Sequence, residues 1–195
     1  MPKLLYQGHG SYRLTSDEKQ VIFVDPYKGK GYDTLADIIL VTHQHGDHNR
    51  VKRCAQKPDC RIISNVEALT GGKHNSFEID GITIQAVEAS NKRHDPSQCV
   101  GYIITLNKVK VYASGDTSTT KQMETFINME LDYALLPGDG VFNMGLEEAA
   151  ECAKLIGAKH NSIIHLIPGM SVRKAAEKWG APNKLILEPG QEIDL

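Results

Sequence analysis

Three histidines and one aspartate within six residues constrain this chain more than any other feature of its sequence. The segment 43–48 reads His-Gln-His-Gly-Asp-His and is separated only by Thr42 from a run of four apolar residues, Ile-Ile-Leu-Val. A strand that ends here projects His43 and His45 to the same side, because side chains alternate with a period of two. Asp47 and His48 then lie in the turn beyond the strand. The spacing therefore predicts two neighbouring half-sites.

The side chains of this segment are typical of a catalytic metal site. Imidazole and carboxylate ligands without thiolate suit zinc in an open site better than in a closed structural one, and iron or manganese is chemically acceptable. The alternative is a solvated polar turn or a hydrogen-bonded histidine pair. Four ligand-type side chains in six residues favour the metal site.

Short runs of β-branched and apolar residues predict a strand-rich chain. Helical periodicity and end signals predict helices over 146–156, over 119–128, and from an N-cap at Ser171 to Trp179. Strands dominate up to residue 113, and strands alternate with helices afterwards, which favours sheets packed on each other over a doubly wound parallel sheet. The predicted strands are 20–24, 37–41, 61–64, 82–87, 100–106, 109–113, 133–136, 162–166 and 184–187.

Length and composition limit the classes of protein to consider. With 195 residues, and without internal repeats or a linker-like tract, the chain is expected to form one domain, 1–195. A formal net charge of -2 disfavours binding to duplex nucleic acid. No apolar run approaches the roughly 20 residues that span a bilayer, and the start lacks an apolar signal core. Four scattered cysteines suit reduced thiols, so we expect a cytoplasmic protein without membrane partners.

The motif His-x-His-x-Asp-His at the end of an apolar strand resembles the signature of the metallo-β-lactamase superfamily. The likeness extends over nearly the whole chain, to Val24-Asp25-Pro26, to Ser114-Gly115-Asp116-Thr117 and to His165 at the end of a late strand. The segments 8–11, 89–94 and 143–150 are similar to a compact branch that includes the ascorbate-6-phosphate lactonase-like hydrolases. This resemblance implies an αββα sandwich, an α+β fold of two mixed β-sheets face to face with helices on the outside.

The resemblance also implies a site for two divalent metal ions. The first ion is expected at His43, His45 and His94, the second at Asp47, His48 and His165, with Asp116 bridging both. Each of the later positions has an ordinary alternative. His94 lies in a polar loop, His165 could be a buried histidine bonded to a backbone carbonyl, and Asp116 could be an acid at a helix start.

Three further residues are expected near the metals. His9, in the opening Gly-His-Gly-Ser, and Asn143 are candidates for binding substrate, although a turn role and loop polarity explain them as well. Asp25 is expected to accept a hydrogen bond from the second nitrogen of a metal-binding histidine, or to cap a turn with Pro26.

Two divalent metals can lower the pKa of a bound water to about 7 and polarise the bond under attack. Asp47 would orient the resulting hydroxide or receive its proton. We therefore expect a hydrolase, with two zinc ions, that acts on a small-molecule ester, lactone, amide or phosphoester. The alternatives are a nucleic-acid phosphodiesterase, di-iron redox chemistry and a non-catalytic metal-binding protein, because a fold does not fix a function. Oligomeric state and substrate are not encoded in these patterns.

Overall fold

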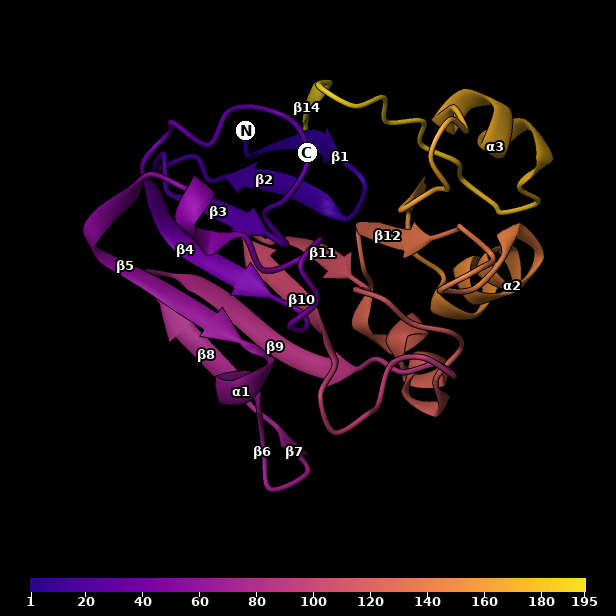
Figure 1. Ribbon diagram of the computed structural model, residues 1–195, viewed down its shortest axis with the longest axis horizontal. Helices are drawn as coiled ribbons and strands as arrows, with labels where there is room; N and C mark the ends of the chain where they lie inside the picture. Colours follow the sequence, from indigo (N-terminus) through magenta and orange to yellow (C-terminus); the bar gives the residue numbers. More distant parts are fainter.

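Two mixed six-stranded sheets packed face to face form the centre of the molecule (Figure 1). The computed structural model describes all residues, 1–195. The first sheet runs, in spatial order, β14 (Glu192–Asp194), β1 (Lys3–Gly8), β2 (Ser11–Thr15), β3 (Val21–Val24), β4 (Ala36–Val41) and β5 (Gln56–Ser64). The second runs β13 (His160–Ile164), β12 (Tyr133–Pro137), β11 (Val109–Ala113), β10 (Val100–Leu106), β9 (Ile82–Glu88) and β8 (Ser76–Ile79). A small hairpin of β6 (Leu69–Thr70) and β7 (Lys73–His74) extends from this body.

The core lies between the two sheets. Residues of both sheets, among them Ile22 and Leu40 from the first and Ile84 and Ile104 from the second, belong to one cluster of 42 buried residues. Each such side chain contributes about 2 kcal/mol when it is fully removed from water. The buried Tyr102 hydroxyl donates a hydrogen bond across the core to the carbonyl oxygen of Val41, at 3.0 Å. The end of β4 is thereby held against the second sheet.

The strands β3 and β4 are buried on both faces, which explains their unbroken apolar sequences. Their outer residues, including Phe23 and Ile39, form a second cluster of 7 buried residues with Tyr32 and Cys54. The cover on this side consists of loops and the short 3-10 helix η1 (Val51–Arg53). Long helices therefore cover only one of the two sheets.

The helices on the second sheet agree closely with the sequence prediction (Figure 1). Helix α2 (Leu146–Ile156) has the predicted bounds, and α3 (Val172–Lys178) begins after a Ser171 cap whose hydroxyl accepts from the Lys174 N–H. The segment predicted over 119–128 is η2 (Lys121–Met129), a 3-10 rather than an α-helix. The one-turn helix α1 (Asn65–Ala68) follows β5.

The predicted sandwich is confirmed, and one predicted strand is wrong. Residues 184–187 form a single bridge, Lys184 to Asn161, instead of a strand. Leu187 is buried in the core without ladder pairing, so its apolar character reflects packing and not a sheet. The sequence patterns also missed β1, β2, β8 and β14, in which apolar and polar residues mix.

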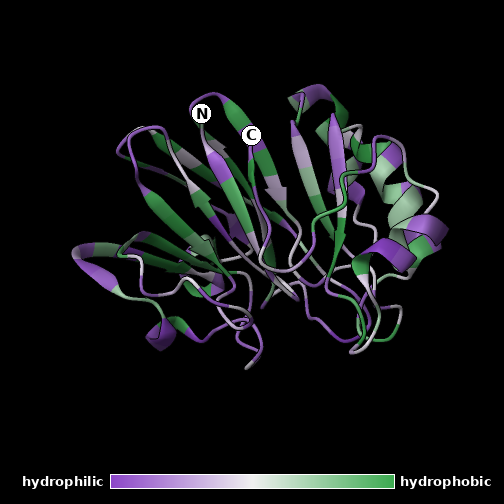
Figure 2. Ribbon diagram, turned by 90° about the horizontal axis from the view of Figure 1, so that it is seen from above, coloured by the Kyte–Doolittle hydropathy of each residue, from purple (hydrophilic) through white to green (hydrophobic).

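Parallel strands in both sheets end at one edge of the sandwich. In the first sheet β3, β4 and β5 are parallel, and in the second β11, β12 and β13 are parallel. The loops beyond these ends are largely hydrophilic, whereas the strands carry the hydrophobic residues (Figure 2). The residues that follow these six ends are Asp25, the segment 42–48, Asn65, Ser114–Asp116, Asp139 and His165. The topology thus gathers chemically active side chains from distant parts of the sequence.

Substitution of Gly115 by alanine would test how tightly this edge of the sandwich is packed. Its φ is +63°, and a Cβ there would lie 2.9 Å from Thr42 Cβ and 3.0 Å from the Val100 carbonyl oxygen. Gly72 is a matched control, because its φ is +77° and a Cβ would meet nothing within 4 Å. We expect Gly72→Ala to cost about 1–2 kcal/mol from backbone strain alone. Gly115→Ala should cost a further amount of about 1–3 kcal/mol from crowding, measured by urea unfolding. Equal losses in the two variants would contradict this packing.

Candidate metal centre

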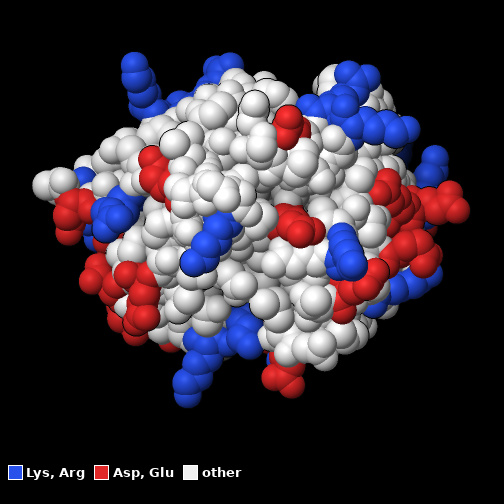
Figure 3. Space-filling model, turned by 90° about the horizontal axis from the view of Figure 1, so that it is seen from below, with Lys and Arg blue, Asp and Glu red and all other residues white.

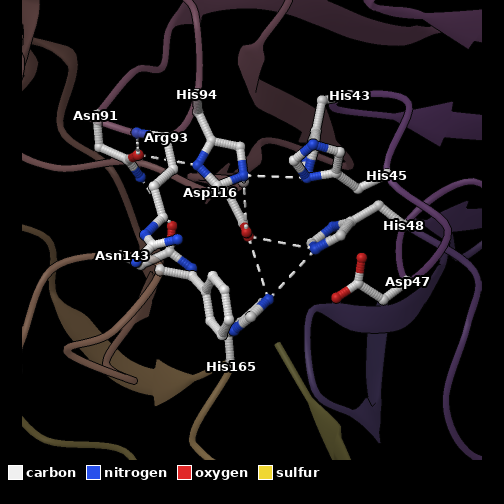
Figure 4. Close-up of polar contacts among 12 residues, drawn as sticks. His43, His45, Asp47, His48, Asn91, Arg93, His94, Asp116, Asn143 and His165 are labelled. Atoms are coloured by element: carbon white, nitrogen blue, oxygen red, sulfur yellow. Dashed lines mark hydrogen bonds and ion pairs between the residues drawn. The ribbon is translucent and has the colours of Figure 1, made fainter.

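Three histidines from two loops bring their ring nitrogens together at this edge (Figure 4). His45 Nδ1 lies 3.0 Å from His43 Nε2 and 3.2 Å from His94 Nε2. His43 and His45 come from the loop after β4, and His94 from the loop between β9 and β10. His94 is 3% exposed, so it is not the surface histidine that its polar loop allowed.

A second group lies beside the first and shares Asp116 with it. His48 Nε2 and His165 Nε2 are 3.3 Å apart, and each lies 3.3 Å from Asp116 Oδ1. The other oxygen, Asp116 Oδ2, lies 3.3 Å from His94 Nε2. The Asp116 carboxylate therefore lies between both groups (Figure 4), with Oδ1 toward one and Oδ2 toward the other.

The donor atoms of both groups fit divalent metal ions. Asp116 Oδ1 is buried and accepts no hydrogen bond. The nitrogens of His43, His45 and His94 converge although ring nitrogens that face one another cannot all donate. Ligands about 2.0–2.1 Å from a tetrahedral zinc lie roughly 3.3 Å from one another, close to the separations seen here. The site therefore suits a cation in each group.

Hydrogen bonds behind the rings of His43 and His48 fix which ring nitrogen of each faces the site. Asp25 accepts from the Thr42 N–H at 2.8 Å and from the Thr42 hydroxyl at 2.7 Å. Because that hydroxyl donates to Asp25, it accepts from His43 Nδ1, 3.0 Å away, and leaves His43 Nε2 free. Asp25 Oδ2 also lies 2.8 Å from His48 Nδ1. Asp25 thus contacts His48 directly and His43 through Thr42.

A chain of amides connects the histidines on the other side of the site. Asn91 Oδ1 lies 2.9 Å from His94 Nδ1, and Asn91 Nδ2 donates to Asn143 Oδ1 at 3.0 Å. Asn143 Nδ2 in turn donates to Asp139 Oδ2 at 2.8 Å, and this same oxygen lies 3.0 Å from His165 Nδ1. The chain links one histidine of each group, so the two halves are positioned together.

Asp47 lies at the mouth of the site and contacts His9. Asp47 Oδ2 is 3.1 Å from His9 Nε2, and the Asp47 side chain is 40% exposed. The His9 ring packs against that of His165, with centroids 3.7 Å apart and the ring planes tilted by 39°, and the His9 backbone carbonyl oxygen accepts from the His165 backbone N–H. His9, Asp47, His48 and His165 form a set whose ligand atoms all lie within 4.8 Å.

Mutual contacts among these groups strongly shift their pKa values. Burial alone would lower the pKa of His48, but the charge and hydrogen bond of Asp25 and the charge of Asp116 raise it to about 9. Burial and the neighbouring His48 lower the pKa of His43 to about 3. Burial opposes ionisation of Asp116, yet the hydrogen bond from His94 and the charge of His48 hold its pKa well below the usual range. The hydrogen bond with His9 lowers the pKa of Asp47. The carboxylates of Asp47 and Asp116 are therefore ionised, as carboxylates that bind a metal must be.

Residues of both groups line a pocket of about 580 Å³, a volume suited to a small molecule. Its walls include His45, Asp47, His94, Asp116 and His165. Asn143, a candidate for substrate binding, does not line it, because its amide is engaged between Asn91 and Asp139.

The structure brings all seven predicted ligand residues to one place, together with His9 and Asp25. Sequence reasoning did not find the supporting residues Thr42, Asn91 and Asp139 in these roles. A usable signal existed for Asn91, which precedes His94 by three residues in a tight turn closed by mutual backbone hydrogen bonds. Asp139 carried a weaker signal, its position directly after the apolar strand β12.

Comparison with known proteins agrees with this geometry. A model of the β-lactamase superfamily domain matches residues 3–161. A UPF0173 metal-dependent hydrolase from Thermococcus onnurineus is 28% identical over all of both chains, and one from Nanoarchaeum equitans is 30% identical over 99% of this chain and 100% of its own. A solved structure from Parabacteroides distasonis, of a protein proposed to be a metal-dependent hydrolase, superposes with a TM-score of 0.77. It is 28% identical and covers 96% of this chain and 93% of that one.

The chain belongs to the β-lactamase superfamily, the class that its two-sheet sandwich and histidine cluster define. Within that superfamily it is a metal-dependent hydrolase of the UPF0173 family.

The distribution of surface charge and the length of the helices indicate whether nucleic acid or membrane partners are expected. On the face drawn in Figure 3, lysine and arginine side chains are scattered among acidic ones and do not gather into a continuous stripe. A basic stripe is the usual footprint of a nucleic-acid-binding protein. No helix has both the length and the apolar character that crossing a membrane requires.

Asp25→Asn tests the support behind His48 and Thr42. The amide removes the charge that faces His48 Nδ1, and loss of such an outer partner typically costs about 10–100-fold in metal affinity. We expect a fall of that size in zinc affinity, measured by competition with a chromogenic chelator. Asp33→Asn removes an exposed carboxylate elsewhere and serves as the control. Unchanged affinity in Asp25→Asn would show that this contact does not support the site.

Proposed function

We propose that this protein is a dizinc hydrolase of a small molecule with an ester, lactone, amide or phosphoester bond. The observation that carries the proposal is the pair of adjacent histidine groups that share the two oxygens of Asp116 at the floor of a pocket. A single structural metal would need neither the second group nor the open pocket.

The ligand roles proposed for each group follow the converging atoms. His43, His45 and His94 would hold one ion through Nε2, Nδ1 and Nε2, and His48, His165 and Asp47 would hold the other. Asp116 would bridge the two ions. Five imidazoles with two carboxylates favour zinc, and manganese or iron remains chemically compatible with these ligands.

Bound in this arrangement, the two cations supply an acidified water as nucleophile and Lewis-acid polarisation of the bond to be cut. Asp47 faces the pocket and would orient such a water by accepting its hydrogen bond. Because its contact with His9 lowers the Asp47 pKa, this carboxylate is better suited to orienting the water than to storing its proton. His9 keeps the Asp47 carboxylate in place.

The place of His9 also supports the proposed branch within the superfamily. The opening segment 8–11, part of the resemblance to the ascorbate-6-phosphate lactonase-like hydrolases, brings His9 against Asp47 and His165. A lactone is therefore among the first bonds to test. The size of the pocket favours a small substrate over a polymer.

Alanine at Asp47 or His165 tests the proposal. Each variant should lose close to one zinc ion per chain by elemental analysis, because each removes a ligand of the same group. Hydrolysis of chromogenic esters, lactones and phosphodiesters should fall by at least about 10²-fold in kcat/KM. His160→Ala, an exposed histidine stacked on Tyr133, is the control. Full zinc content and full turnover in both variants would refute the proposed site.

A further inference from the structure

Two basic side chains line the pocket without an acidic partner. Lys28 comes from the loop after β3 and Arg93 from the loop that carries His94, and both belong to the pocket wall. Neither takes part in any ion pair of the chain.

The acidic groups of the same pocket are already engaged. Asp47 contacts His9, and Asp116 contacts three histidines. Asp139 accepts from the N–H groups of Val141, Phe142 and Asn143 and from the Asn143 amide. The positive charges of Lys28 and Arg93 are therefore not neutralised by their surroundings, and they face the space that a substrate would fill.

Arg93 is an exposed residue, but contacts of its backbone and of its guanidinium hold it at the pocket. Its backbone N–H donates to Asn91 Oδ1 at 2.8 Å, the same oxygen that faces His94 Nδ1. Its guanidinium lies over the Phe142 ring, 5.1 Å from the centroid. Stacking of this kind leaves the edge of the guanidinium, with its N–H donors, free for an anion. Figure 4 shows Arg93 beside His94 and Asn143.

Part of the pocket wall is apolar. Leu166, Ile167 and Pro168 follow His165 and line the pocket, and the same three residues line an adjoining cavity of about 520 Å³. Ile167 and Met170 are exposed there, at 36% and 39%. A substrate that fills this pocket would contact both basic and apolar side chains.

We propose that the substrate carries a carboxylate or phosphate remote from the bond that is cut, and that Arg93 binds this anion in a bidentate manner. The proposal rests on the proposed function, because it identifies the substrate class of that same pocket. Arg93 is then a specificity residue and not a ligand. The planar fork of arginine matches both carboxylate and phosphate, and such charge-assisted contacts are the strong ones.

Binding of paired dicarboxylates tests the proposal independently of turnover. Succinate, glutarate and adipate each present a second carboxylate that the corresponding monoamide lacks. Calorimetry with the zinc-loaded protein should show, for at least one chain length, a diacid that binds about 10-fold more tightly than its monoamide. Replacing the remote carboxylate by a phosphonate distinguishes a preference for phosphate.

Four variants assign the preference to a residue. Arg93→Met should reduce the ratio of the two affinities to about one, and Arg93→Lys should retain part of it because the charge remains. Lys28→Met should leave most of the preference. Lys92→Met, which removes the neighbouring exposed charge outside the pocket wall, is the matched control and should change nothing.

Three results would overturn the proposal. These are a diacid preference that survives Arg93→Met, a preference abolished by Lys28→Met alone, and no diacid preference at any chain length, including no binding at all. Failure of the proposed function looks different, because the zinc-loaded protein would then cleave no ester, lactone or phosphodiester while the binding ratio could still depend on Arg93.

Discussion

The buried carboxylate of Asp25 is the contact on which the rest of the site depends. It is 1% exposed and accepts from the backbone and hydroxyl of Thr42 while it faces His48 Nδ1. A buried charge is tolerable only when it is paired and hydrogen-bonded, and each such bond to a charged group contributes about 1.5–3 kcal/mol. Asp25 thereby joins the end of β3 to the loop after β4. The Thr42 carbonyl accepts from the Val100 N–H, which extends the connection to the second sheet.

The predicted ligands come from both sheets, so the site is a junction between the two halves of the molecule. The segment 43–48 belongs to the first sheet, and His94, Asp116 and His165 belong to the second. Each sheet ends in three parallel strands, and their carboxyl ends meet at the same edge. A cation held by ligands from both halves would bind the folded chain only, and its binding energy would add to the stability of the sandwich.

Sequence patterns predicted those features that depend on interactions between residues close together in the chain. Helix α2 and the Ser171 cap follow from periodicity and end signals within a dozen residues, and the ligands at 43–48 are neighbours in the chain. The hydrogen bond between Asn91 and Asn143 has no such signature, because it connects polar loops 52 residues apart. The N-terminal strands pair with β14 at the far end of the chain, which no local window detects. The wrong strand at 184–187 makes the first contact of a ladder with Asn161 and then leaves it to bury Leu187.

Three residues of the site, His9, Asp25 and His165, have left-handed backbone conformations, with φ of 56°, 46° and 48°. Side chains other than glycine accept this region at a cost of order 1–3 kcal/mol each. Glycine or asparagine at these positions would fold more easily but would remove an imidazole or a carboxylate from the centre. The sequence at these turns is therefore a compromise between folding and chemistry in which chemistry prevails. A variant with glycine or asparagine at these three turns would be more stable but would lack residues of the site. Selection for thermostability alone would therefore favour inactive variants of this enzyme.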